Sequence, residues 1–242
     1  MNKYQKFFEN YTAQFNMSEW AFGYKHDHTL RVMDLCGDIA NSLKMSKEDI
    51  ELAKLVGLFH DIGRFEQWRE GESFNDRKTF DHGARGVKIL KQSNIINEHP
   101  QKELIFTAVE NHNKIVIDPQ IKDRHVLKMC KIVRDADKLD IINSLIEGRI
   151  QQEKLIVKQK SYSPEALQFL KNHQAINRKV CPSEADRALT SLSLFFDINF
   201  EFSKQYICEH RLITKLVQLY IKLNPDQEKM FRQLEANILE VY

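Results

Sequence analysis

The chain has 242 residues and a formal net charge of +2 at pH 7, from 36 basic and 34 acidic side chains. This near balance gives no overall electrostatic attraction to nucleic acid or to an anionic membrane surface, so we expect neither as a partner. A hydrophobic content of 42% with only 8 Gly and 5 Pro is typical of a globular protein rich in helices.

The cysteines and the N-terminal segment bear on the cellular compartment. The four cysteines are far apart and form no CxxC pair, which disfavours a thiolate zinc site and a secreted disulfide framework. We therefore expect reduced thiols. The first residues lack the apolar core of a signal peptide, and no apolar run approaches the roughly 18 residues that cross a membrane. These features together predict a cytoplasmic protein.

The first two helices are predicted from their apolar spacing. Residues 3–15 carry an aromatic stripe at helical spacing that we assign to the core. In the next helix His28 recurs with Val32 and Ile39 at i, i+4 and i+11, so its imidazole points where the apolar side chains point. His26 is offset by about 200° around the same helix, and we expect it to be exposed.

An apolar helix that ends in His60 and Asp61 forms the predicted centre of the fold. Ser46 is expected to cap it and Gly63 to end it. An imidazole beside a carboxylate is costly to bury unless each is paired or bound to a cation. A single His-Asp doublet is also typical of a helix end or a structural hydrogen bond, so the other helices decide between these interpretations.

Two further histidines fall on inward helix faces. Residues 66–80 are predicted to form a polar loop, either a lid or a solvated connection. The helix that follows begins near His82, which shares a side with Ile89 and Leu90. Another helix starts near Pro100 and ends at His112, in register with Ile105 and other apolar residues.

The segment 124–146 is predicted to supply a distant carboxylate. Asp137 shares a face with Cys130 and Val133, whereas Asp135 is assigned to the charged side. A basic stripe on this segment fits either a solvated face or a polyanion site: Arg124, Lys128, Lys131 and Lys138. Lys138 has a second interpretation, in which it approaches the site beside Asp137.

Beyond Gly148 the chain is predicted to remain helical, without a linker, repeat or low-complexity segment. Ser163 with Pro164 opens one helix, and Ser183 is a candidate cap for the next. Asp197 lies within an apolar run, where a structural hydrogen bond is the preferred interpretation over a supporting role at the site.

The inward histidines and carboxylates form one ordered set: His28, His60, Asp61, His82, His112 and Asp137. They lie in the motifs HTLRV, FHDIGRF, DHGARG, ENHN and RDADKLD, within residues 20–150. In this order and spacing the chain resembles the HD superfamily of metal-dependent phosphohydrolases, in its two-metal form.

The resemblance implies an all-α fold, an HD-domain-like helical bundle with a C-terminal helical extension. Residues 1–150 would form the metal-binding core with its N-terminal helix, and residues 151–242 a helical extension packed on that core as part of the same globular unit. His28, His60, Asp61 and Asp137 would hold one divalent ion, with Asp61 bridging to a second ion on His82 and His112. Imidazole and carboxylate ligands suit Mn, Fe, Co, Ni, Zn or, less well, Mg.

The resemblance also implies the chemistry. Paired ions activate a water molecule to attack a phosphate ester and clamp the phosphoryl oxygens. We assign catalytic roles to Asp61, to Arg64, where some two-metal relatives have Lys, and to Lys138. The expected substrate is small and phosphorylated, such as a nucleotide. No GYP signature follows His112, so a cyclic dinucleotide is not assigned.

Two other functions fit the same residues. One is an HD-fold di-iron oxygenase, which would use the same six ligands to activate dioxygen. The other is a catalytically silent module that binds a metal ion or a nucleotide. The complete ligand set argues against the silent module, because loss of activity would first relax the ligands.

Overall fold

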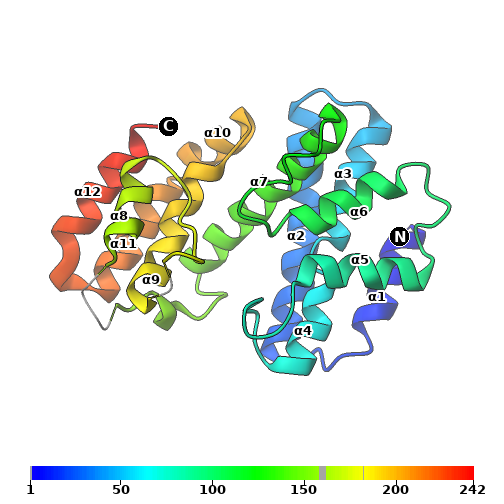
Figure 1. Cartoon of the computed structure of the whole chain (residues 1–242), viewed down its shortest axis with the longest axis horizontal. Coiled ribbons are helices and arrows are strands. Elements are labelled where there is room, and N and C mark those ends of the chain that lie inside the picture. The colour runs from blue at the N-terminus through cyan, green and yellow to red at the C-terminus, as the bar shows by residue number, and fades with distance from the viewer. Residues whose placement is uncertain (1, 158–161, 182) are drawn as a thin grey trace. The chain divides into compact units, whose positions relative to one another are not determined.

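The computed structural model describes residues 2–157, 162–181 and 183–242 (Figure 1). Within these ranges the chain consists of helices, short 3-10 turns and connecting loops, and contains no strand. The predicted all-α fold class is confirmed. None of the described helices is long and apolar enough to span a membrane.

The chain divides into two compact units, Met1–Asp137 and Lys138–Tyr242, and the division lies within α7. The first unit comprises α1 (Lys3–Thr12), α2 (Trp20–Ser42), α3 (Lys47–Phe59), α4 (Gly63–Gly71), α5 (His82–Ser93), α6 (Lys102–Asn111) and the first part of α7 (Arg124–Ile146). The division after residue 150 that the sequence suggested stays a prediction.

Close packing of α2 against α3 forms the centre of the first unit. Gly57 permits this approach, because a Cβ atom there would lie 2.8 Å from the Cα atom of Met33. The facing residues Val32, Val56 and Phe59 are fully or almost fully buried. This packing fixes the end of α3 in the interior, where His60 and Asp61 follow directly.

The predicted caps at Ser46, Ser163 and Ser183 are present, and each side chain accepts a hydrogen bond from a backbone N–H three residues later. The prediction for Gly63 was wrong. It is the first residue of α4, and residues up to Gly71 are helical instead of forming a loop.

Packing explains why α4 was missed. Phe65 and Gln67 of this helix are fully buried. Its other face is charged, and Glu66 and Glu70 pair with Arg85 of α5 at 2.6 Å and 2.9 Å. Tertiary contacts with α5 therefore stabilise a helix in a segment whose composition suggested a loop. The loop that remains, residues 72–81, is tied to α4 by hydrogen bonds from Gln67.

The second unit contains η1 (Gln152–Leu155), α8 (Pro164–Lys171), α9 (Glu184–Ser193), η2 (Leu194–Asp197), α10 (Glu201–Glu209), α11 (Leu212–Leu223), η3 (Pro225–Gln227) and α12 (Glu228–Leu239). Its core is built on α11, whose Tyr220 is fully buried and donates to the backbone oxygen of Ala188. Asn224, just after α11, accepts from the backbone N–H of Val157 at 2.7 Å and donates to the backbone oxygen of Leu155.

All four cysteines are free thiols, as predicted. Cys36, Cys130 and Cys181 are buried, and Cys208 is exposed. Burial raises the pKa of the Cys36 thiol well above its ordinary value, with Asp137 and Asp135 adding to the effect. It also raises that of Cys130 to about 11. These thiols are core residues rather than nucleophiles.

Candidate metal centre

Five segments of the first unit bring the six predicted side chains together. His28 projects from α2, His60 and Asp61 follow the last residue of α3, His82 begins α5, His112 follows α6, and Asp137 lies on α7. The four histidines and Asp61 are each no more than 5% exposed. Four of the six residues lie at helix ends, where the backbone turns and the side chains can converge.

The first half of the cluster gathers around one oxygen of each carboxylate. The Nε2 atom of His28 lies 3.2 Å from Oδ1 of Asp137 and 3.4 Å from Oδ2 of Asp61. The Nε2 atom of His60 lies 3.3 Å from that of His28 and 3.5 Å from the same Asp61 oxygen. Four possible ligand atoms therefore surround one point.

The second half gathers around the other oxygen of Asp61. The Nε2 atoms of His82 and His112 lie 3.3 Å and 3.4 Å from Oδ1 of Asp61, and 3.0 Å from each other. One carboxylate thus faces both halves of the cluster, one oxygen to each. This is the arrangement of a bridging ligand.

Hydrogen bonds behind the rings orient three of the histidines. The Nδ1 atom of His60 lies 2.7 Å from the backbone oxygen of Gly57, and that of His112 lies 2.7 Å from the backbone oxygen of Val109. The Nδ1 atom of His82 lies 2.8 Å from Asp76. A carbonyl oxygen can only accept, so Nδ1 carries the proton and the Nε2 lone pair points inward.

These tautomers leave the interior of the cluster rich in acceptors. The Nε2 atoms of His82 and His112 present lone pairs to each other and to the Asp61 carboxylate, an unfavourable arrangement without a cation. With metal–ligand bonds of about 2.1 Å, neighbouring ligand atoms lie about 3.0 Å apart in an octahedron and about 3.4 Å apart in a tetrahedron. The distances between these side chains fall close to that range.

Two sets of ligand atoms among the described residues could hold a metal ion. They are His28, His60 and Asp137, and His60, Asp61 and His112, each with its atoms within 4.8 Å of one another. His82 extends the second set through its contacts with Asp61 and His112. The donor chemistry, imidazole and carboxylate without thiolate, fits a divalent transition metal.

The ionisation states favour the same conclusion. Burial lowers the pKa of His112 to about 4, which keeps the imidazole neutral, the form that binds a metal. Burial alone would raise the pKa of Asp61, but the Lys25 ammonium and the His60 ring hold it well below its usual range. Against the same effect of burial, His28 and His60 keep the pKa of Asp137 well below its usual range.

Comparison with known proteins identifies this region. Residues 26–142 match the family model of the HD domain. The chain contains an HD domain. The matched residues include all six members of the cluster, and the family is a superfamily of metal-dependent hydrolase type. No curated protein and no solved structure shows significant similarity to the chain.

Asp76 organises the polar residues around the second half of the HD-domain cluster. Besides His82, its carboxylate accepts hydrogen bonds from Arg64 Nη1, Gln67 Nε2 and Asn113 Nδ2, each at 2.9 Å. These contacts hold the pKa of Asp76 below its usual range, against the effect of burial. No role was predicted for Asp76, because nothing in a polar loop signals that one carboxylate reaches a histidine six residues later.

Arg64 lies at the edge of the cluster, where it was predicted to act on phosphate. Its Nε atom lies 3.5 Å from Oδ1 of Asp61. Its Nη1 atom donates to Asp76, to the side chain of Gln67 and to the backbone oxygen of Phe74. The guanidinium is therefore fixed on one side by three acceptors, and its catalytic role stays a prediction.

Lys25 is a site residue that sequence reasoning missed. It lies one turn before His28 on α2 and is 7% exposed, and its Nζ atom lies 2.5 Å from Oδ2 of Asp61. Its spacing of three residues from His28 was a signal that placed both on one helix face. A lysine is usually exposed, however, and its partner lies 36 residues away.

Asp135 and Lys138 of α7 are both buried. Asp135 was assigned to the charged side and is instead fully buried, so that assignment was wrong. Lys138 was expected either on a solvated face or beside the site. It is 7% exposed, and its Nζ atom lies 2.9 Å from Oδ2 of Asp197 within the second unit. This ion pair agrees with a structural role for Asp197, and a catalytic role for Lys138 stays a prediction.

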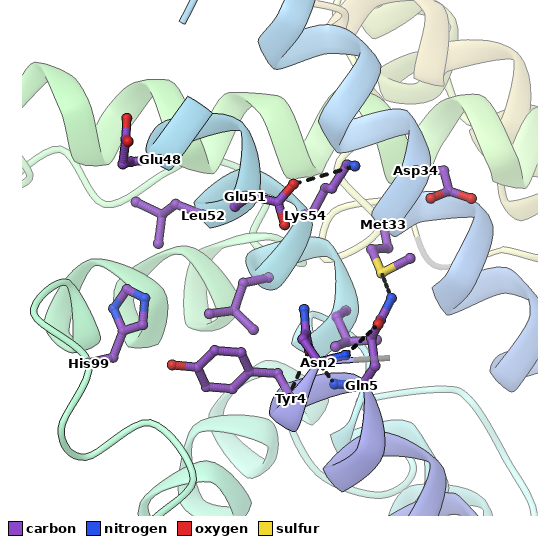
Figure 2. A pocket seen from close by; sticks show the side chains of 12 residues that line it. Asn2, Tyr4, Gln5, Met33, Asp34, Glu48, Glu51, Leu52, Lys54 and His99 are labelled. Carbon is purple, nitrogen blue, oxygen red and sulfur yellow. Dashed lines mark hydrogen bonds and ion pairs between the residues drawn. The ribbon is translucent and has the colours of Figure 1, made fainter. Parts of the chain in front are cut away.

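A separate hollow of about 310 Å³ lies among α1, α2, α3 and His99 (Figure 2). None of the six cluster residues lines it. Its polar side chains engage one another, with Lys54 3.6 Å from Glu51 and Gln5 3.8 Å from the sulfur of Met33. The His and Asp chemistry lies elsewhere in the HD domain, and the candidate site is therefore the cluster and not this hollow.

Proposed function

We propose that the chain is a metal-dependent phosphohydrolase that cleaves a phosphate ester of a nucleotide or a similar small metabolite. The observation that carries this proposal is the position of Asp61, with one oxygen toward His28 and His60 and the other toward His82 and His112. Bridging carboxylates of this kind support two-ion hydrolysis. The match to the HD domain also supports the proposal, because the HD superfamily is one of metal-dependent hydrolase type.

The roles of the residues follow from their chemistry. His28, His60, Asp61 and Asp137 would hold one divalent ion, and Asp61, His82 and His112 a second. Bound ions would supply an activated water and positive charge for the phosphoryl oxygens. Asp76, Gly57 and Val109 keep three imidazoles in the ligand tautomer. Arg64 would neutralise phosphate charge from the edge of the cluster.

A substrate screen tests the proposal. Nucleotides, dinucleotides and generic phosphatase substrates would be incubated with the protein and Mn, Co, Ni, Mg or Fe(II), and phosphate release measured. We expect turnover by the parent protein and loss of at least about a hundredfold in Asp61→Ala. The matched control is Asp34→Ala, which removes an exposed carboxylate from the helix that carries His28.

The same screen separates hydrolysis from the oxygenase alternative. Oxygen uptake would be recorded in parallel with ferrous protein, organophosphonates and polyols. Oxygen consumption without phosphate release under any metal would replace the hydrolase by an oxygenase. Binding of metal without either reaction would favour the silent module.

Variants of the second half refine the test. His82→Ala and His112→Ala should spare the first ion and lose the second, which should lower kcat more than it raises KM. Arg64→Ala should lower the rate less, because the ions carry most of the charge stabilisation. Equal losses in all three variants would argue against two distinct ion sites.

A further inference from the structure

Lys25 shares an oxygen with the proposed metal ligands. Its Nζ atom lies 2.5 Å from Oδ2 of Asp61, the same oxygen that lies 3.4 Å from His28 and 3.5 Å from His60. A divalent ion held by Asp61, His28 and His60 would share Asp61 Oδ2 with the ammonium. Two cations on one carboxylate oxygen repel strongly in a buried site, so the ammonium must turn to another anion.

The two cations beside Asp61 differ in how they are held. Arg64 has three acceptors at Nη1 besides its contact with Asp61. Among the residues that the structure describes, the polar partner of the Lys25 ammonium is Asp61 alone, and the four-carbon lysine side chain can reorient without breaking other hydrogen bonds. Lys25 is therefore the cation that can change partner at low cost.

Aromatic rings keep the ammonium close to the cluster. The Nζ atom of Lys25 lies 5.5 Å from the centroid of Tyr24 and 5.4 Å from that of Phe74. Tyr24 in turn stacks on His28 with a centroid distance of 5.7 Å. Ring faces attract a cation but offer it no full charge, so they confine Lys25 to the site without replacing an anionic partner.

We propose that Lys25 binds the phosphoryl group of the substrate, exchanging Asp61 Oδ2 for a phosphoryl oxygen when a divalent ion occupies the site. This inference rests on the proposed function and adds a substrate-binding residue to it. It has opposite consequences for the affinities for metal and for phosphate. In the metal-free protein Lys25 competes with the metal for Asp61, whereas in the loaded protein it attracts the anion.

Calorimetric titration of Lys25→Met measures both consequences without turnover. Mn²⁺ is titrated into metal-free protein, and inorganic phosphate is then titrated into the Mn²⁺-loaded protein. Methionine is close to lysine in length and removes the charge. We expect Mn²⁺ affinity to rise about tenfold and phosphate affinity to fall about tenfold, the order of effect of one nearby unit charge.

Two further variants complete the test. Lys25→Arg keeps the charge and should bind Mn²⁺ and phosphate within about threefold of the parent protein. The control Lys54→Met removes a partly exposed lysine from α3, which pairs with Glu51 at 3.6 Å, and should change neither affinity. Circular dichroism checks that each variant is folded; if Lys25→Met does not fold, loss of phosphate affinity in Lys25→Arg relative to Lys54→Met would overturn the inference.

The outcomes separate the inference from the proposed function. If the parent protein binds Mn²⁺ and phosphate but Lys25→Met binds phosphate equally well, the role of Lys25 is wrong and the hydrolase proposal stands. If Lys25→Met binds Mn²⁺ and phosphate both more weakly, Lys25 has only a structural role. If the parent protein takes up no Mn²⁺, the proposed function and this inference both fail.

Discussion

Replacing Asp76 by alanine tests whether one carboxylate orders the second half of the metal centre. Asp76 accepts hydrogen bonds from His82, Arg64, Gln67 and Asn113 at 2.8–2.9 Å. A hydrogen bond to a charged group contributes about 1.5–3 kcal/mol. Because the Asp76 side chain is 32% exposed, water replaces part of this, and we expect the free energy of unfolding to fall by about 3 kcal/mol in total.

The effect on metal binding is more specific than the effect on stability. Loss of an outer hydrogen-bond partner typically lowers metal affinity by about 10–100-fold. Of the proposed metal ligands, the hydrogen bonds of Asp76 described above reach His82, a ligand of the second ion, and none of the ligands of the first. The Asp76→Ala substitution should therefore lower the affinity for the second ion by about this factor and leave the affinity for the first ion within about threefold of that of the parent protein.

Equilibrium dialysis against increasing Mn²⁺, followed by elemental analysis, would resolve the two affinities. Asp81→Asn is the matched control. Asp81 caps α5 through the backbone N–H of Ala84 and accepts from Asn113 and Lys114, and asparagine preserves the cap. Equal weakening of both ions in Asp76→Ala, or no weakening of either, would refute the assignment of His82 to a separate ion.

Three other predictions follow from the same structure. Gly63→Ala should lower the free energy of unfolding by more than about 2 kcal/mol, because a Cβ atom would collide with the backbone oxygen of His82. Gly37→Ala, where a Cβ atom meets only the flexible side chain of Lys54, should change it by less than about 1 kcal/mol, and urea titrations of the two variants measure the difference. The pKa of His112 is about 4 in the folded protein against 6.5 when unfolded, so the stability present above pH 6.5 is lost as the pH falls toward 4, by about 3 kcal/mol at most. In the metal-free protein, the free energy of unfolding of His112→Gln should fall less steeply with decreasing pH, and a pH profile identical to that of the parent protein would contradict this cause. In the folded protein only Cys208 should react rapidly with a thiol reagent, with all four cysteines reacting after unfolding; rapid labelling of a second thiol would show that the described burial is wrong.

Helical periodicity predicted the inward direction of five of the six cluster residues, all except Asp61, which was chosen because it follows His60. His28 continues a row of apolar residues on α2 and is fully buried. His60 and His112 each follow the last turn of a predicted helix, and α7 has the predicted bounds, Arg124–Ile146. The spacing of apolar residues along a helix is a local property, so the sequence alone predicts which helix face is buried. The ligand roles of these residues remain the proposal that metal analysis must test.

Contacts between distant segments could not be predicted in the same way. The ion pair of Lys25 with Asp61 joins α2 to the end of α3, and Asp76 reaches His82 from a loop. Charged residues in α4 suggested a loop, although Phe65 and the ion pairs with Arg85 make it a helix. Each of these features depends on a partner that the local pattern does not contain.

The metal content of purified protein shows whether the six cluster residues bind metal ions. The parent protein, Asp61→Ala and Asp34→Ala would be incubated with equal Mn²⁺, freed of unbound ion and analysed by elemental analysis. We predict up to two bound ions per chain in the parent protein and in Asp34→Ala, and loss of most bound metal in Asp61→Ala, because Asp61 faces both halves of the cluster. Equal metal in Asp61→Ala and the parent protein, or none in either, would contradict the account.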